Sequence, residues 1–510
     1  MKNKFYVTTA IAYVNAAPHM GHALEFVLTD ALARYHRLKG DNTFFLTGTD
    51  EHGVKIYNSA KKAGMDTQAF VDKNAQTFID LDRLLNLSND DFIRTSDRKR
   101  HWPACQKLWK KLADAGDLYE KEYEGLYCEG CEVFMQPRDL VNGNCAIHLK
   151  PPSIVREKNY FFKLSKYSPQ ILKLIESDTL KIIPEARKHE ILGVVREGLT
   201  DVSFSRPRTV LPWGVEVPGD PTQVMYVWSD ALTNYISAIG YAEESADYKT
   251  FWPADLQVIG KDIVRFHAGI WIGMLLAAGI QPPKSILVHG FITHEGQKMS
   301  KSLGNVVDPI GLLARYGTDA VRFYFLREIP NGRDGDYNDT LFMERYNSDL
   351  ANNLGNLVNR VHNLISKNGI TDFEFGVESD AYRAMVAETW KHYMASMDES
   401  NVHETVSHVW KLIDFCNKTI DQEKPWSLAK TDLARARSVL CNLIETIRHI
   451  SLMVSPLLPD SAQKIRLMIG LPPVERFSDE QEWGSVPRWN NVGVGCILFP
   501  RIEPPKSEGK

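Results

Sequence analysis

Residues 5–46 read FYVTTAIAYVNAAPHMGHALEFVLTDALARYHRLKGDNTFFL, and this stretch decides the fold class. Its apolar start predicts a strand from Phe5 to Val14, and the loop that follows ends near His19. A helix is predicted from Gly21 to Lys39, because apolar side chains recur at helical spacing at Leu24, Leu28, Leu32 and Tyr35. A second strand is predicted at Thr43 to Leu46. Strand, helix and strand in this order predict a parallel sheet that binds its ligand at the carboxyl ends of the strands.

The α/β pattern is interrupted once and is then followed by helices. Residues 115–215 contain a cysteine cluster, strand-like aromatic runs and few long helices, which predicts an insertion. Strands that run into helices resume at VMYVWSDALTNYI, residues 224–236. From about residue 345 to 470 the pattern is helical, with one apolar face at Leu350, Leu354, Leu357, Val361 and Leu364. We therefore predict a doubly wound parallel-sheet (Rossmann-type) α/β domain, split by the insertion and followed by an all-α bundle.

The composition is that of an ordinary globular protein. Hydrophobic residues make up 44% of the 510 residues and charged residues 24%, and no window approaches the roughly 18–20 apolar residues that cross a bilayer. The amino terminus lacks an apolar signal core, so we expect a cytoplasmic protein without a membrane partner. The net charge of -4 provides no overall basic field for a nucleic acid. A nucleic acid would have to be bound by local patches such as Arg94, Arg98, Lys99 and Arg100, although such a cluster is more often a solvated helix face.

A histidine motif, His19-Met20-Gly21-His22, lies between the first predicted strand and its helix. Helix amino termini present N–H groups and a partial positive charge, so a phosphate can bind there. Gly21 lets the backbone approach closely, and the two imidazoles can donate hydrogen bonds to phosphate oxygens. Taken alone, a histidine pair at a helix start is as readily structural.

A lysine motif, Lys298-Met299-Ser300-Lys301-Ser302, stands between a predicted strand and the helix start at Asp308. Two ammonium groups on a loop bracketed by glycines suit a triphosphate whose charge must be neutralised as it is cleaved. As a basic loop it would be unremarkable, but this string is rare by chance.

A cysteine cluster lies in the predicted insertion, as Cys128-x2-Cys131 and Cys145-x2-His148 separated by a turn-rich segment. Two close pairs of thiolate and imidazole ligands suit tetrahedral zinc, and four protein ligands close the site, so the metal is expected to be structural. The other cysteines are scattered, which favours a metal over disulfides. The alternative is a set of unused thiols.

Together, the histidine and lysine motifs resemble the HxGH and KMSKS signatures of the class I aminoacyl-tRNA synthetases. The cysteine cluster, in its YCEGC context, is similar to the single zinc knuckle of the zinc-type methionyl-tRNA synthetases. The resemblance covers residues 5–500 and implies two steps: methionine and ATP form methionyl-adenylate and pyrophosphate, and the methionyl group then passes to the 3′-terminal adenosine of tRNA(Met), initiator tRNA included. It implies that His19 and His22 stabilise the α-phosphate and that Lys298 and Lys301 hold the pyrophosphate. The implied ATP-binding residues are His19, Gly21, His22, Lys298, Ser300 and Lys301, with Mg²⁺ bound to the ATP.

The methionine pocket is also assigned by resemblance. A thioether is best held by apolar and aromatic walls. The residues that match the family's pocket are Ile11, Tyr13, Asp50, Trp228, Ala231, Tyr235, Ile263 and His267, and Asp50 would receive the substrate ammonium. Any single aromatic among them is more often core than ligand. For tRNA, the match implies that Asn356, Arg360 and Trp426 read the anticodon, because single-stranded bases are recognised by stacking and hydrogen bonds.

The resemblance gives each segment of the chain a role. The predicted limits are 1–114 and 218–292 for the two halves of the catalytic domain, 115–217 for the connective insertion with the zinc knuckle, 293–345 for the KMSKS and stem-contact region, 346–475 for the anticodon-binding helices and 476–510 for the carboxyl-terminal segment. No additional dimerising module is recognised, so we expect a monomer. Two alternatives are a small-molecule nucleotidyltransferase, which needs no helical RNA-reading domain, and an inactive paralogue that binds tRNA for regulation, although both histidines and both lysines are intact.

Overall fold

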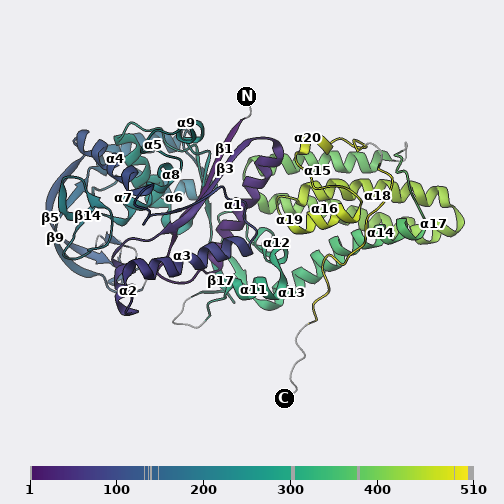
Figure 1. Cartoon of the computed structure of the whole chain (residues 1–510), viewed down its shortest axis with the longest axis horizontal. Coiled ribbons are helices and arrows are strands. Elements are labelled where there is room, and N and C mark those ends of the chain that lie inside the picture. The colour runs from purple at the N-terminus through teal and green to yellow at the C-terminus, as the bar shows by residue number, and fades with distance from the viewer. Residues whose placement is uncertain are drawn as a thin grey trace, which may run out of the picture.

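A parallel sheet forms the centre of the amino-terminal half of the molecule (Figure 1). The computed structural model describes residues 3–130, 132–135, 137, 140–147, 149–299, 305–375, 379–486 and 489–503. Within these residues, seven strands pair in the order β10-β16-β15-β1-β3-β2, with β4 also on β3, and every pair is parallel. The strands are β1 (Lys4–Thr9), β2 (Ala12–Tyr13), β3 (Asn42–Asp50), β4 (Asp91–Arg94), β10 (Lys181–Ile183), β15 (Leu256–Gly260) and β16 (Ser285–His289). The predicted fold class is confirmed.

Alternate residues of the central strands face opposite sides of the sheet, as the two-residue period of a strand requires. Val258 and Leu287 pack with the long helix α1 (Met20–Lys39), whereas Ile259 and Val288 pack with α4 (His101–Asp114) and α10 (Ile272–Ala277). Both faces are therefore covered by helices, which explains why these strands are almost continuously apolar. The remaining helices of this half are α2 (Val54–Lys62), α3 (Thr67–Leu84), α7 (Val227–Ala231), α8 (Asn234–Ser237) and α9 (Ala246–Phe251), with a π-helix at Phe266–Trp271.

The predicted strand from Phe5 to Val14 is interrupted. β1 ends at Thr9, and β2 resumes at Ala12 to pair with the last residues of β3. Between them, the amide of Ala10 donates to the carbonyl of Val258 and to the carboxylate of Glu25. The break opens a hollow at the carboxyl edge of the sheet.

The insertion is built on a long antiparallel pair, β5 (Leu118–Cys128) and β9 (Ser153–Phe162). It also contains β6 (Val133–Met135), β7 (Leu140–Val141), β8 (Asn144–Cys145), β11 (Val202–Ser203), β12 (Ser205–Pro207) and β13 (Glu216–Val217), the helices α5 (Ser168–Glu176) and α6 (Glu185–Arg196), and, just beyond its predicted end, β14 (Asp220–Met225). One part of the predicted range 115–217 needs correction: β10 lies inside it, yet pairs with β16 at the edge of the catalytic sheet. A three-residue strand carries too little periodicity to be recognised in the sequence.

Helices make up the carboxyl-terminal half, as predicted. α18 (Leu433–Val454) is buried along almost its whole length. Around it lie α14 (Asn356–Lys367), α15 (Asp380–Asp398), α16 (Val402–Glu423), α17 (Pro425–Thr431), α19 (Pro459–Met468) and α20 (Phe477–Glu480). The connection from the sheet runs through β17 (Ile292–His294), β18 (Gln297–Lys298), β19 (Gly335–Tyr337), α11 (Pro309–Tyr316), α12 (Thr318–Glu328), α13 (Asp339–Arg345) and a π-helix at Tyr346–Gly355.

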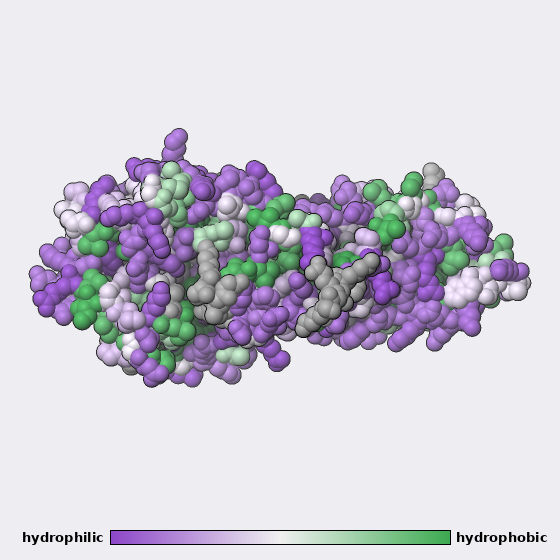
Figure 2. Space-filling view, turned by 90° about the horizontal axis from the view of Figure 1, so that it is seen from below, coloured by the Kyte–Doolittle hydropathy of each residue, from purple (hydrophilic) through white to green (hydrophobic). Residues whose placement is uncertain are grey.

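The two halves share one hydrophobic core, which runs from β1 and α1 through α12 into the bundle. A buried ion pair lies at this junction: Arg322 of α12 is 2.7 Å from Asp30 of α1 and also donates to the carbonyls of Leu457 and Leu85. On the face shown in Figure 2, hydrophilic residues cover most of both halves and hydrophobic residues form small separate patches. In the part of the chain that is described, no helix combines the length and apolarity needed to span a bilayer.

Candidate active site

A cavity of about 570 Å³ opens at the carboxyl ends of β1, β3, β15 and β16. This is the edge where open α/β sheets bind ligands. Two groups of predicted residues line it together: His19, Gly21 and His22 of the histidine motif, and all eight residues of the expected methionine pocket. Met299 of the lysine motif and Val306 just beyond it, which were not among the predicted site residues, also line the cavity. Segments nearly 300 residues apart in the sequence therefore face one space.

His19 and His22 cap the first turn of α1 reciprocally. The amide of Gly21 donates to His19 Nδ1 at 3.1 Å, and the amide of His19 donates to His22 Nδ1 at 3.2 Å. Since both Nδ1 atoms accept, the ring proton of each neutral imidazole is on Nε2, where it can be donated to a ligand oxygen. The rings stack with centroids 3.8 Å apart. A side chain at Gly21 would lie only 3.0 Å from the His19 ring, which explains the glycine.

Burial and the carboxylate of Glu25 shift the pKa values of two histidines at this end of the cavity in opposite directions. Burial, with smaller contributions from His19 and His289, lowers the pKa of His22 well below its usual value. His289, at the end of β16, has its Nε2 2.9 Å from the carboxylate of Glu25. Burial opposes the charged form of His289, but Glu25 outweighs it and raises the pKa of His289.

The lysine motif begins on a tight hairpin. β17 and β18 are joined by Glu295 and Gly296, both with positive φ, as a two-residue hairpin turn requires. The backbone of Lys298 belongs to β18, and Met299 reaches the cavity. The side chain of Lys298 and the residues Ser300 and Lys301 lie outside the described part of the chain.

Aromatic side chains form the amino-acid end of the cavity. Trp228 stacks on Phe266 with centroids 4.0 Å apart and planes 4° apart. His267 Nδ1 donates to the carbonyl of Ile263 at 3.0 Å, so its Nε2 accepts from the hydroxyl of Tyr235, 2.6 Å away. Burial lowers the pKa of His267 to about 4, which keeps the imidazole neutral. An apolar, uncharged wall of this kind suits an unbranched thioether.

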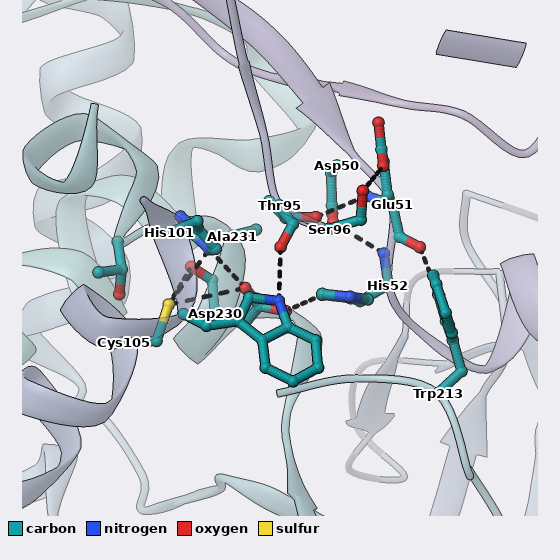
Figure 3. Close-up of polar contacts among 12 residues, drawn as sticks. Asp50, Glu51, His52, Thr95, Ser96, His101, Cys105, Trp213, Asp230 and Ala231 are labelled. Carbon is teal, nitrogen blue, oxygen red and sulfur yellow. Dashed lines mark hydrogen bonds and ion pairs between the residues drawn. The ribbon is translucent and has the colours of Figure 1, made fainter. Parts of the chain in front are cut away.

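Asp50 is the acidic group of this end and lies at the carboxyl terminus of β3 (Figure 3). Burial, followed by the negative charge of Asp230, raises the pKa of Asp50 well above its usual value. Its neighbour Glu51 is held by Arg94, at 2.6 Å, and by Thr49. Arg94 therefore supports the site through its ion pair with Glu51, and Arg100 forms an ion pair with Asp91. Both guanidinium groups already have a carboxylate partner, which argues against their being RNA contacts.

A buried carboxylate, Asp230, ties three elements together beneath this end of the cavity (Figure 3). One oxygen lies 2.5 Å from His52 Nδ1, two residues after Asp50, and the other lies 2.6 Å from His101 Nε2 on α4. Burial alone would raise the pKa of Asp230, but the two histidines outweigh it and lower the pKa to about 2. The helix that carries Asp230, α7, also carries Trp228 and Ala231.

His101, Cys105 and Asp230 bring possible ligand atoms within 4.8 Å of one another, but they form a hydrogen-bond network and not a metal site. Two ligands of one tetrahedral zinc stand roughly 3.3 Å apart, given bonds of about 2.0–2.1 Å. The 2.6 Å between His101 Nε2 and Asp230 Oδ1 is a direct hydrogen bond.

The expected zinc ligands lie in the insertion. Cys128 ends β5 and Cys145 ends the short strand β8, and both thiols are buried. Two buried thiols at strand ends in a turn-rich segment fit a structural knuckle. Cys131 and His148 lie outside the described residues.

The expected anticodon residues gather at the far end of the bundle, where Figure 1 shows α17 beside α14. The Arg360 guanidinium lies 5.3 Å above the ring of Trp426, which is 40% exposed. Asn356 is exposed one turn before Arg360 on the same face of α14. Asp421 accepts from Arg360 at 2.9 Å.

Several cavity residues were not predicted, and some carried a signal. Glu25 follows His22 by one helical turn, and His289 ends a buried strand just before Gly290, so both occupy positions where ligand contacts are expected. Glu132 and Ile147 of the insertion carried no such signal, because their approach to the cavity depends on tertiary packing.

Comparison with known proteins agrees with this arrangement. Residues 5–139 and 128–362 match the family described as tRNA synthetases class I (M), and residues 372–508 match the anticodon binding domain of methionyl tRNA ligase. The methionine–tRNA ligase of Clostridium perfringens is 42% identical over 98% of this chain and 78% of its own length, and that of Rickettsia conorii is 40% identical over 99% and 100%. The Mycobacterium tuberculosis methionyl-tRNA synthetase in complex with methionyl-adenylate superposes with a TM-score of 0.92 at 39% identity, covering 98% of this chain and 100% of that one.

A parallel sheet with a cavity at its carboxyl edge and a histidine-capped helix beside it fits a class I aminoacyl-tRNA synthetase, and the family match over residues 5–362 is to that class. The identity of at least 40% to methionine–tRNA ligases over nearly the whole chain narrows the class to one family. The chain belongs to the methionyl-tRNA synthetase family, as the sequence resemblance implied.

Proposed function

We infer that this chain activates methionine with ATP and transfers the methionyl group to the 3′-terminal adenosine of tRNA(Met), initiator tRNA included. This inference rests on one observation: the histidine-capped end of α1 and the aromatic pocket line the same cavity at the carboxyl edge of the sheet. A nucleotidyltransferase would not need the carboxyl-terminal helical domain, which matches an anticodon binding domain.

In the first step, a methionine carboxylate oxygen bonds to the α-phosphorus of ATP while the bond from that phosphorus to the bridging oxygen breaks. We propose that His19 and His22 donate from Nε2 to the α-phosphate, and that Lys298 and Lys301, with Ser300, hold the departing pyrophosphate. Gly21 allows the phosphate to approach the helix end. Mg²⁺ accompanies ATP and offsets its charge. Catalysis is then positioning and charge stabilisation without a protein nucleophile.

Methionine specificity is assigned to the aromatic end of the cavity. Asp50 receives the ammonium, and the thioether lies against apolar and aromatic side chains. The proposed set is Ile11, Tyr13, Asp50, Trp228, Ala231, Tyr235, Ile263 and His267. Asn356, Arg360 and Trp426 are proposed to contact the anticodon, by stacking and hydrogen bonds.

Methionine-dependent exchange of labelled pyrophosphate into ATP tests the proposed function. We expect exchange with methionine and none with leucine; equal exchange with leucine, or no exchange, would reject the assignment. His22→Ala should lower the rate at least 100-fold by removing a donor to the transition state. His36→Ala is the matched control, because His36 lies on the same helix but pairs with Asp41 outside the cavity.

We further propose one structural zinc ion held by Cys128, Cys131, Cys145 and His148. Elemental analysis of the purified protein should find about one zinc per chain, and Cys145→Ala should lose it, whereas Cys416→Ala, a buried cysteine of the bundle, should retain it. A wild-type protein without zinc after metal-replete expression would contradict the proposal.

We also propose a cytoplasmic location, a monomeric state and the domain limits expected from the sequence, with β10 (Lys181–Ile183) assigned to the catalytic sheet. Sedimentation equilibrium should give the mass of one chain, 57.9 kDa. A stable species of twice that mass would overturn the monomer.

A further inference from the structure

A carboxylate from the insertion enters the cavity next to the proposed methionine pocket. Glu132 belongs to the turn between β5 and β6, is only 4% exposed and lines the cavity. Its φ is +56°, a left-handed backbone conformation that is uncommon for a residue with a side chain. The turn therefore adopts a specific shape that directs this carboxylate inward.

The Glu132 carboxylate joins three separate elements through hydrogen bonds. Oε1 accepts from the hydroxyl of Tyr13 on β2 at 3.0 Å and from the amide of Lys55 at the start of α2 at 2.6 Å. Oε2 accepts from the hydroxyl of Tyr127 on β5. Both oxygens are thus occupied by donors from the sheet edge, a neighbouring helix and the insertion itself.

The backbone beside this junction is shaped around the contact. Gly53 has a φ of +105°, and a side chain there would lie 2.6 Å from the Tyr13 hydroxyl and 3.0 Å from Glu132 Oε1. Only glycine leaves space for Tyr13 and Glu132 to meet. The ammonium of Lys55 also lies 5.7 Å from the centre of the Tyr13 ring.

The direction of the Tyr13 hydrogen bond has a chemical consequence. A phenol has one proton to donate, and Tyr13 donates it to Glu132, away from Asp50, which is its partner in the β2–β3 register. Asp50 thereby keeps its carboxylate for another donor, and the Tyr13 ring is held in one orientation against the cavity.

We propose that Glu132 is a positioning residue for methionine, through which the insertion sets the orientation of Tyr13 in the amino-acid pocket. This inference rests on the proposed function, since it gives Tyr13 the role of a pocket wall. It predicts that Glu132 acts on methionine binding and leaves the chemical step and the ATP site unchanged.

The test is a set of variants assayed by methionine-dependent pyrophosphate exchange and by methionine binding without ATP, followed through tryptophan fluorescence. Glu132→Ala should raise the methionine KM and Kd about tenfold, the effect of one lost charge-assisted hydrogen bond, with kcat and the ATP KM within twofold of wild type. Glu132→Gln, which keeps an acceptor for Tyr13, should recover most of the affinity. Glu129→Gln is the matched control: Glu129 is exposed in the same turn and accepts only from Asn58 among the contacts described.

A double-mutant cycle separates positioning from general support of the fold. Tyr13→Phe should weaken methionine binding, and adding Glu132→Ala to Tyr13→Phe should cost less than Glu132→Ala costs alone, because both act through one hydroxyl. An unchanged methionine KM in Glu132→Ala would overturn the proposal, and so would additive effects in the cycle or equal rises in the KM values for methionine and ATP. A failure of the proposed function would instead appear in the wild type, as absent exchange with methionine.

Discussion

At the scale of single residues, Asp50 shows how the pocket suits a cation. Its pKa is raised by burial and by the nearby charge of Asp230, so the carboxyl holds a proton more readily than an exposed aspartate does. A bound ammonium favours the ionised form. On the proposal that Asp50 receives the methionine ammonium, we expect methionine binding and the ionisation of Asp50 to be coupled.

Methionine binding should release a proton from Asp50. Because the bound state prefers the carboxylate, affinity should rise as the pH rises from the acid side, until the substrate amine itself loses its proton. Calorimetry in two buffers of different ionisation enthalpy measures the proton count directly. Identical heats in the two buffers would contradict the coupling.

His267 makes a prediction about acid stability. Its pKa is about 4 in the folded protein, against about 6.5 for an unperturbed histidine. Between these values the unfolded chain binds the proton and the folded chain does not, so this residue's contribution to stability falls as the pH falls from 6.5 to 4. Urea unfolding at pH 7 and pH 5 should show a smaller loss of unfolding free energy in His267→Gln than in the wild type. An equal loss would show that His267 titrates normally.

At the scale of elements, Asp230 fixes α7 relative to the end of β3 and to α4. Asp230→Asn keeps the shape but removes the charge between two imidazoles, leaving one without its acceptor. The unfolding free energy should fall by about 1–3 kcal/mol, and the methionine KM should rise, because Trp228 and Ala231 move with α7. Denaturant titration and exchange kinetics measure both. Asp247→Asn, an exposed carboxylate on α9, is the control, and equal behaviour of the two variants would exclude a role for the network.

The elements differ in how far the sequence determines them. The bounds of α1 were predicted to within one residue, because apolar side chains that recur at helical spacing over many residues can be recognised from the local sequence alone. The interruption at Ala10 was missed, since it depends on contacts with Val258 and Glu25 that are far away in the sequence. β10 was missed because it has only three residues and because its partner, β16, lies about 100 residues further on. The residue types of the site were recognisable by resemblance, whereas the Asp230 network and the contact of Glu132 exist only in the folded chain.

At the scale of the whole molecule, the proposed activation and anticodon sites lie in the two different halves of an elongated shape (Figure 1), which share a core through α1 and α12. Because the two sites are separate, we expect a substitution in the anticodon site to lower aminoacylation of tRNA and to leave pyrophosphate exchange unchanged. Trp426→Ala should lower aminoacylation of tRNA at least tenfold through loss of base stacking, while pyrophosphate exchange stays within twofold. Leu467→Ala, another exposed apolar residue of the bundle, should change neither rate. A parallel fall of exchange in Trp426→Ala would contradict this separation.

We propose that the two signature motifs act on one nucleotide beside one amino-acid pocket. The decisive measurement is a crystal structure with a non-hydrolysable methionyl-adenylate analogue bound. We expect His19 and His22 to approach the phosphate position, the lysine motif to contact the phosphate side of the same ligand, and Tyr13, Trp228 and His267 to surround the thioether. An analogue bound elsewhere, or with its thioether away from these aromatic residues, would show that the motifs do not act on one ligand.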